Sequence, residues 1–142
     1  MDQKLSNPKD VIGQKKLPMG LVPDSMTAYA SLSFLEGALK YGRYNWRHAG
    51  VRSSVYRDAL DRHLSRWWNG EDVDPDTLVP HLASALACIA IILDADLSGK
   101  LTDDRPPRQE DLPKLLDAMQ SNIAHLKDLF KDHDPHQYTI KD

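Results

Sequence analysis

Residues 77–96 read TLVPHLASALACIAIILDAD, and this stretch decides the fold class. Its apolar side chains fall on most faces of a helical projection, and a helix of that kind lies in the middle of a bundle. Its longest apolar run, residues 85–93, is far shorter than the roughly 20 residues that cross a bilayer. The stretch therefore predicts a central helix that follows Asp76 or Thr77 and ends near Asp96.

A helix is also predicted before the central one, over residues 24–41. Asp24 or Ser25 can begin it after Pro23, and Gly42 ends it. Four apolar residues at a 4-3-4 spacing share one face of this helix: Ala28, Leu32, Leu35 and Leu39.

The next helix is predicted over residues 53–70, and His63 lies near the middle of its apolar side. His81 similarly flanks the apolar stripe of the central helix. Each histidine can be a buried neutral imidazole, or instead a ligand, a base or a phosphate contact. Asp58 and Arg62 share the opposite side of the 53–70 helix. They can form an exposed salt bridge, or point into a cleft if this helix is covered on both sides.

A fourth helix is predicted over residues 109–131, after a linker that contains one glycine and two prolines (98–108). Apolar residues follow a 4-3-4-3-4 spacing along it, which is typical of a coiled-coil seam. Such a seam can pack on the bundle or on another subunit. The seam residues are Leu112, Leu116, Met119, Ile123, Leu126 and Phe130.

These patterns predict one helical, nucleotide-binding domain over residues 24–131. An irregular arm rich in proline, glycine and lysine precedes it (1–23), and a flexible polar tail follows it (132–142). No alternating strand pattern is present in the sequence. We therefore expect an all-α fold, a bundle of about four helices.

Composition excludes several classes of protein. The formal charge of −3 is too acidic for a general DNA or RNA coat. The single cysteine, Cys88, permits neither an intrachain disulfide framework nor a multi-thiolate zinc site. The first ten residues lack the apolar core of a signal peptide. We expect a soluble cytoplasmic protein with no membrane and no nucleic-acid polymer as partner.

The segment from residue 40 to residue 48 mixes cations, aromatic rings and an amide. Cations bind phosphates, aromatic rings stack on bases, and an asparagine amide can bond a base edge. A surface loop with anchoring aromatics is the alternative, but the mixture favours nucleotide binding. The candidate residues here are Lys40, Tyr44, Asn45, Trp46 and Arg47.

Carboxylates are concentrated in the turn 71–76, which has four in six residues. Glu36 lies at the border of the leucine face, with Lys40 one turn further on. Mg²⁺ prefers one or two carboxylates together with substrate phosphates, and these acids could supply them. The alternatives are a solvated turn that favours the helix N-terminus and an exposed Glu–Lys pair.

With these residues in view, the chain resembles a phage-associated family of dATP/dGTP diphosphohydrolases, which is related to MazG-like nucleotide pyrophosphohydrolases. The resemblance covers about residues 5 to 107. Its motifs are NPKDVIG (7–13), LVP (21–23), LEGALKYGRYNWR (35–47), YRDALDRHLSRWWNGEDVDPD (56–76), HLASALA (81–87) and DDRPP (103–107).

The resemblance implies a MazG-like, often oligomeric bundle in the cytoplasm of a phage's bacterial host. It implies cleavage of a purine deoxynucleoside triphosphate, dGTP or dATP, to the monophosphate and pyrophosphate with Mg²⁺ or Mn²⁺. On this hypothesis the catalytic acids are Glu36, Asp58 and Glu71, and the metal ligands are these three with Asp74 and His81. The substrate-binding residues are Lys40, Tyr44, Asn45, Trp46, Arg47, Arg62 and His63.

Two other functions are compatible with the same sequence. One is a nucleotide-binding protein without turnover, such as a phage sponge for a signalling nucleotide, in which the acids would be dispensable. The other is a purely structural interaction protein that works through the 112–130 seam.

Overall fold

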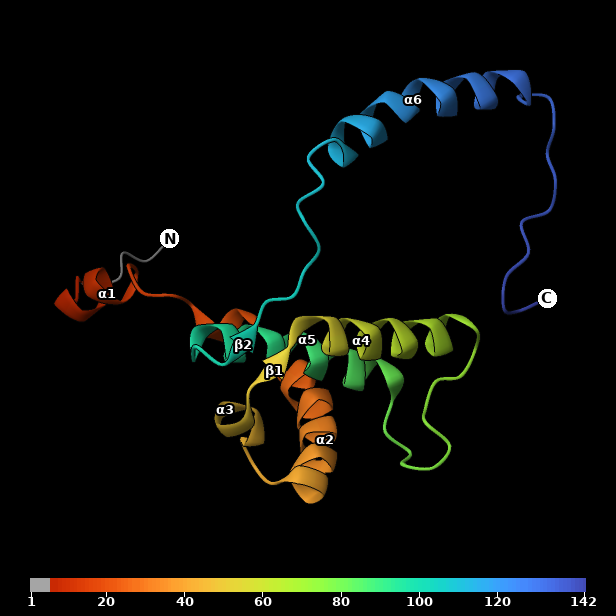
Figure 1. Cartoon of the computed structure of the whole chain (residues 1–142). Helices are drawn as coiled ribbons and strands as arrows, with labels where there is room; N and C mark the ends of the chain where they lie inside the picture. The colour runs from red at the N-terminus through yellow and green to blue at the C-terminus, as the bar shows by residue number, and fades with distance from the viewer. Residues whose placement is uncertain (1–5) are drawn as a thin grey trace.

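The computed structural model describes residues 6–142, and its regular elements are all helical apart from two strands of two residues each (Figure 1). The expected all-α fold is confirmed. The elements in chain order are α1 (Pro8–Gly13), the 3-10 turn η1 (Met19–Leu21), α2 (Asp24–Tyr41), α3 (Asn45–Ala49), β1 (Val51–Arg52), α4 (Ser53–Trp68), α5 (His81–Leu97), β2 (Leu101–Thr102) and α6 (Leu112–Leu129).

Helix α5 is the centre of the fold, as its apolar sequence predicts. Helix α4 packs along it, and α2 packs against it from another side (Figure 1). Small side chains let neighbouring helices approach closely, since interaxial distance depends on the residues at the contact. The buried alanines of α5 are Ala83, Ala85, Ala87 and Ala95.

The predicted start of this central helix, after Asp76 or Thr77, is too early. Helix α5 begins at His81, and the residues before it form a loop closed by a bridge between Val73 and Pro80. Leu78 has a φ of 60°, in the left-handed region that a right-handed helix excludes. The loop therefore has a fixed conformation, and it holds Glu71 beside His81, the first residue of α5.

Helix α2 contacts α5 through a face different from its leucine face. Ser33 is buried there, and its Oγ lies 3.4 Å from Oγ of Ser84 on α5. The 4-3-4 face points away from this contact: Leu32 and Leu35 are about half exposed, and Leu39 is 79% exposed. The sequence pattern identified an apolar face correctly, but within this chain nothing in the described residues covers it.

The segment 42–50, expected to be a loop, contains the short helix α3 and leads into β1. Tyr44 precedes α3 with a left-handed φ of 58°. Strands β1 and β2 pair in parallel, Val51 opposite Leu101. At Gly50, where φ is 77°, an added Cβ would lie 2.9 Å from the carbonyl oxygen of Lys100. Only glycine permits this approach, which joins the start of α4 to the end of α5.

The start of α4 agrees with the prediction, and a residue far along the chain fixes it. Asp104 accepts hydrogen bonds from the backbone N–H of Ser54 (2.8 Å) and from the hydroxyls of Ser53 and Ser54. These bonds lower the pKa of Asp104 to about 2, with the Ser54 hydroxyl contributing most. A carboxylate at this position satisfies N–H groups that have no partner inside the helix.

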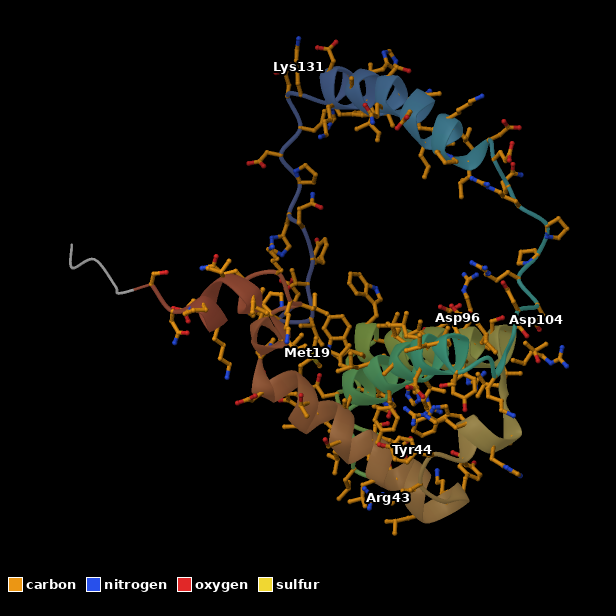
Figure 2. The ribbon with its side chains drawn as sticks, turned by 90° about the vertical axis from the view of Figure 1, so that its left-hand side faces the viewer. Met19, Arg43, Tyr44, Asp96, Asp104 and Lys131 are labelled. Carbon is orange, nitrogen blue, oxygen red and sulfur yellow. The ribbon has the colours of Figure 1, made fainter. Side chains whose placement is uncertain are left out.

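Helix α6 lies apart from the other helices, on the far side of the α4–α5 pair from α2 (Figures 1 and 2). It begins at Leu112, later than the predicted residue 109. Its six seam residues are about half exposed, so the seam packs on no other part of residues 6–142. Among these residues, no helix is both long and apolar enough to cross a bilayer.

The N-terminal arm is more regular than expected. Asn7 caps α1 by accepting the backbone N–H of Lys9 at 2.9 Å, and Pro8 occupies the first turn, where a missing N–H costs nothing. A single 3-10 turn, η1, follows. The part of the predicted arm before residue 6 lies outside the described residues.

Candidate functional site

Three hydrogen-bonded side chains connect α4, the loop that follows it and the start of α5. His81, the first residue of α5, is completely buried. Its Nδ1 lies 3.0 Å from Nδ1 of His63 on α4, and its Nε2 lies 2.7 Å from Oε1 of Glu71 in the loop. Three residues that the sequence singled out separately therefore form one hydrogen-bonded unit.

When His63 and His81 are both neutral, their hydrogen-bond partners decide which ring nitrogens carry the protons. An ionised carboxylate only accepts hydrogen bonds, so Nε2 of His81 carries a hydrogen and donates it to Glu71. Nδ1 of neutral His81 is then an acceptor, and Nδ1 of His63 is the donor. The remaining ring nitrogen of His63, Nε2, keeps its lone pair and is available as a base.

The environment of His63 keeps its ring neutral. Burial lowers its pKa below the usual 6.5, and the positive charges of His81, when that ring is protonated, and of Arg66 lower it further. Glu36, on α2, acts in the opposite direction, so its charge reaches His63 across the α2–α4 boundary. A half-buried imidazole that is neutral near pH 7 is the form that accepts a proton.

The loop acids are organised around Arg66. Its guanidinium lies 3.3 Å from the Asp74 carboxylate and 3.8 Å from that of Glu71. Asp74 also accepts the backbone N–H groups of Thr77 and Asp76, and these bonds lower its pKa. Asp74 therefore shapes the turn, and Glu71 remains the loop acid that bonds a histidine.

Helix α2 contributes a second ion pair beside this cluster. Lys40 Nζ lies 3.1 Å from Oε1 of Glu36, and this hydrogen bond raises the pKa of the lysine. The Asp74 carboxylate adds a smaller effect in the same direction. The Glu36–Lys40 pair of α2 is thus electrostatically coupled to His63 and to the loop.

Asp58 and Arg62 are not part of the hydrogen-bonded cluster. Both are exposed on α4, and the salt bridge considered between them is not formed. The ion pair on this helix joins Arg57 to Asp61 instead, at 3.3 Å. The charge of Arg62 nevertheless lowers the pKa of His63 slightly, so the arginine lies within electrostatic range of the site.

The aromatic segment 44–47, which contains α3, is anchored by a residue that sequence reasoning missed. Asp94 of α5 accepts Nε1–H of Trp46 at 2.7 Å and two N–H groups of Arg47 at 2.8 Å each. The guanidinium of Arg47 also lies 4.7 Å from the ring centre of Tyr44. These contacts fix α3 against α5, and they lower the pKa of Asp94 to about 2, the arginine contributing most. A carboxylate inside an otherwise apolar helix was the available signal, because it requires partners.

Asn45 lines an open pocket of roughly 260 Å³ beside α4. Tyr41, which belongs to the aromatic segment 40–48, and Tyr56, which sequence reasoning did not select, form other walls of it. Burial raises the pKa of Tyr56, so its hydroxyl stays protonated. Two rings and an amide around one opening can hold a planar base by stacking and by hydrogen bonds to its edge.

The five predicted metal ligands do not form a metal site within the chain. Among residues 6–142, no group of three or more histidine, cysteine or acidic side chains is placed to hold a metal ion. Glu71 and His81 bond each other, Glu36 pairs with Lys40, and Asp58 stands apart. The donor set therefore does not fit a preformed metal site.

A family model described as dATP/dGTP diphosphohydrolase, N-terminal, matches residues 6–105. The chain belongs to this family. The match contains every element of the site, from α2 to the start of α5, and ends beside Asp104, the residue that caps α4. Helix α6 lies beyond it. No curated protein and no solved structure matches the chain.

Proposed function

We propose that the protein hydrolyses a purine deoxynucleoside triphosphate, dGTP or dATP, to the monophosphate and pyrophosphate. The observation that carries the proposal is the His63–His81–Glu71 chain, which leaves an unprotonated ring nitrogen beside a group of cations. Membership of a dATP/dGTP diphosphohydrolase family supports the substrate class.

In the proposed mechanism, Nε2 of His63 removes a proton from a water molecule. The water oxygen bonds to the α-phosphorus, and the bond from this phosphorus to the bridging oxygen breaks. Pyrophosphate leaves with that electron pair. The positive charge that develops on His63 is stabilised through His81 by the Glu71 carboxylate, the arrangement in which an acid orients a histidine base.

The substrate would lie across α2 and α4. Lys40, Arg62 and Arg66 are the cations that would bind the triphosphate, because all three are exposed and the charges of Arg62 and Arg66 act on His63. The pocket lined by Tyr41, Asn45 and Tyr56 would hold the base. Trp46 and Arg47 would act by holding α3 in place through Asp94.

We also propose that Mg²⁺ or Mn²⁺ enters as a complex with the triphosphate. Mg²⁺ commonly keeps several waters and takes only one or two carboxylates beside substrate phosphates, so it needs no cage of protein ligands. Glu71, which bonds His81, and Glu36, whose charge acts on His63, are the candidates for this contact.

The test is the release of monophosphate and pyrophosphate from dGTP and from dATP, followed by chromatography. We expect both products in equal amounts with Mg²⁺ or Mn²⁺, and none with EDTA. Glu71→Gln should reduce the rate more than tenfold, because the neutral amide no longer stabilises the charged histidine. An unaffected variant would remove the loop acid from the mechanism.

Calorimetry on the same preparation separates the non-catalytic alternative. Tight nucleotide binding that EDTA does not change, with no product, would indicate a nucleotide-binding protein without turnover. The lack of a preformed metal cluster among residues 6–142 is the observation that keeps this second candidate.

A further inference from the structure

Helix α6 is an amphipathic helix that stands away from the body of the protein. None of its residues is buried, although apolar side chains recur along its seam. A helix of this length is only marginally stable alone in water, and most helices in proteins are stabilised by packing of an apolar face. Helix α2 differs, because it already packs on α5 through its inner face around Ser33. Helix α6 therefore has the stronger requirement for a partner.

Helix α5 has an uncovered apolar face beside the segment that leads to α6. Leu93 and Asp96 of α5 line a pocket of roughly 160 Å³ together with Arg105 of that segment. Figure 2 shows Asp96 on the side of the body that faces α6. Ile89 and Leu93 precede Asp96 by seven and three residues, so they share its face of the helix. The α5 row on this face comprises Leu82, Leu86, Ile89, Leu93 and Leu97.

The α5 row and the α6 seam match in length and in direction. Helix α5 has 17 residues and α6 has 18, which correspond to about 26 and 27 Å at the usual rise. The two helices run in opposite directions, because α6 starts near the end of α5 and leads back towards its start (Figure 1). Both rows advance in steps of three and four residues. This order sets Leu97 opposite Leu112, Leu93 opposite Leu116 and Ile89 opposite Met119.

We propose that α6 is a hinged helix that closes on the α5 row and completes a four-helix bundle with α2, α4 and α5. Residues 103–111, which contain Pro106 and Pro107, form the hinge, and the structure shows the open arrangement. A short tether holds α6 beside α5 at an effective concentration on the order of millimolar. The helix of the same chain is therefore favoured over that of a second copy in dilute protein.

The tail that follows α6 connects the hinged helix to the loop of the candidate site. Gly70, with a φ of 96°, directly precedes Glu71, and an added Cβ at Gly70 would lie 3.2 Å from Cδ1 of Ile140. Residues 105–142 thus touch the body at both ends of α4, through Asp104 and through Ile140. Closure would bring the last turn of α6 towards the loop that carries Glu71. Any consequence for turnover rests on the proposed function, whereas the closure itself does not.

A disulfide between the two rows tests the closure. Leu93→Cys/Leu116→Cys sets two thiols opposite each other, and the native Cys88 is buried, so the background is low. After mild oxidation of dilute protein, we expect a link within one chain, seen as a monomer of altered mobility on a non-reducing gel. The matched control is Leu93→Cys/Lys114→Cys, whose second thiol lies on the opposite face of α6 and should stay reduced. No link, equal linking of both variants, or a link between two chains would overturn the proposal.

Hydrogen exchange tests the closure without added cysteines. The amides of α6 should exchange about tenfold faster or more in Leu93→Asp than in the wild type, because the charge on α5 removes the partner of α6. Leu93 is 67% exposed in the open arrangement, so the body should still fold. The control is Leu39→Asp, the same change at an exposed leucine of α2, which should leave α6 unaffected. Unchanged exchange in Leu93→Asp, or an equal change in Leu39→Asp, would overturn the proposal, and neither result depends on catalysis.

Discussion

Asp94 and Glu71 each accept hydrogen bonds from side chains of another element, and they differ in how many of their oxygens are occupied. Asp94 receives three hydrogen bonds from Trp46 and Arg47, which use both of its oxygens. Glu71 bonds His81 with one oxygen and remains partly open to solvent. A carboxylate whose oxygens are all bonded, such as Asp94, fixes structure. The Glu71–His81–His63 chain ends instead in a ring nitrogen of His63 that has no bond within the chain, so it retains the capacity to react. This contrast assigns anchoring to the first cluster and, under the proposed function, chemistry to the second.

The largest effect is expected from His63→Ala. Loss of a general base costs about 100-fold or more in rate, so monophosphate release should fall by at least that factor. Circular dichroism should show unchanged helix content, because His63 is only half-buried. The control is Arg57→Ala, which removes an exposed ion pair from the same helix. Equal activity in the two variants would contradict the assignment of His63.

Asp94→Asn is expected to reduce stability more than activity. The amide cannot satisfy Arg47 and Trp46 together, so α3 loses its anchor and the melting temperature should drop by several degrees. At temperatures well below melting, the rate should fall less than in His63→Ala. If Asp94→Asn retained full stability and lost all activity, the division between the two clusters would be wrong.

The pH dependence of kcat/KM should depend on the cluster that contains His63. The pKa of His63 is lowered below 6.5, mainly by burial, so the ring takes up its proton at a lower pH than a free histidine does. The midpoint of the acid limb of the wild-type kcat/KM should therefore lie below pH 6.5. This acid limb should disappear in His63→Ala. A profile that breaks at or above pH 6.5 would contradict a neutral histidine base.

The smallest effect concerns stability in acid. The pKa of Asp94 is about 2 in the folded chain and ordinarily 3.8. A lowered folded pKa stabilises the fold above pH 3.8, and this contribution is lost as the pH falls from 3.8 towards 2. Asp104 titrates over the same range. The melting temperature of Asp94→Asn should therefore change less between pH 5 and pH 2.5 than that of the wild type, and identical slopes would contradict this.

The sequence predicted much of the fold and part of the site. The central helix was predictable because a stretch that is apolar all round has only one stable location. His63 and His81 were identified because each lies on an apolar helical face. Their contact was not predictable, since it depends on how the loop before α5 directs His81 towards α4. The inner face of α2 was missed because Ser33 carries no hydrophobic signal, whereas the leucines opposite it do.

The bonds of Asp104 to the start of α4 have a mechanical consequence. The segment that leads to α6 leaves the body at this residue (Figure 2). A force applied to α6 would therefore act, through Asp104, on the first turn of α4, the helix that carries His63.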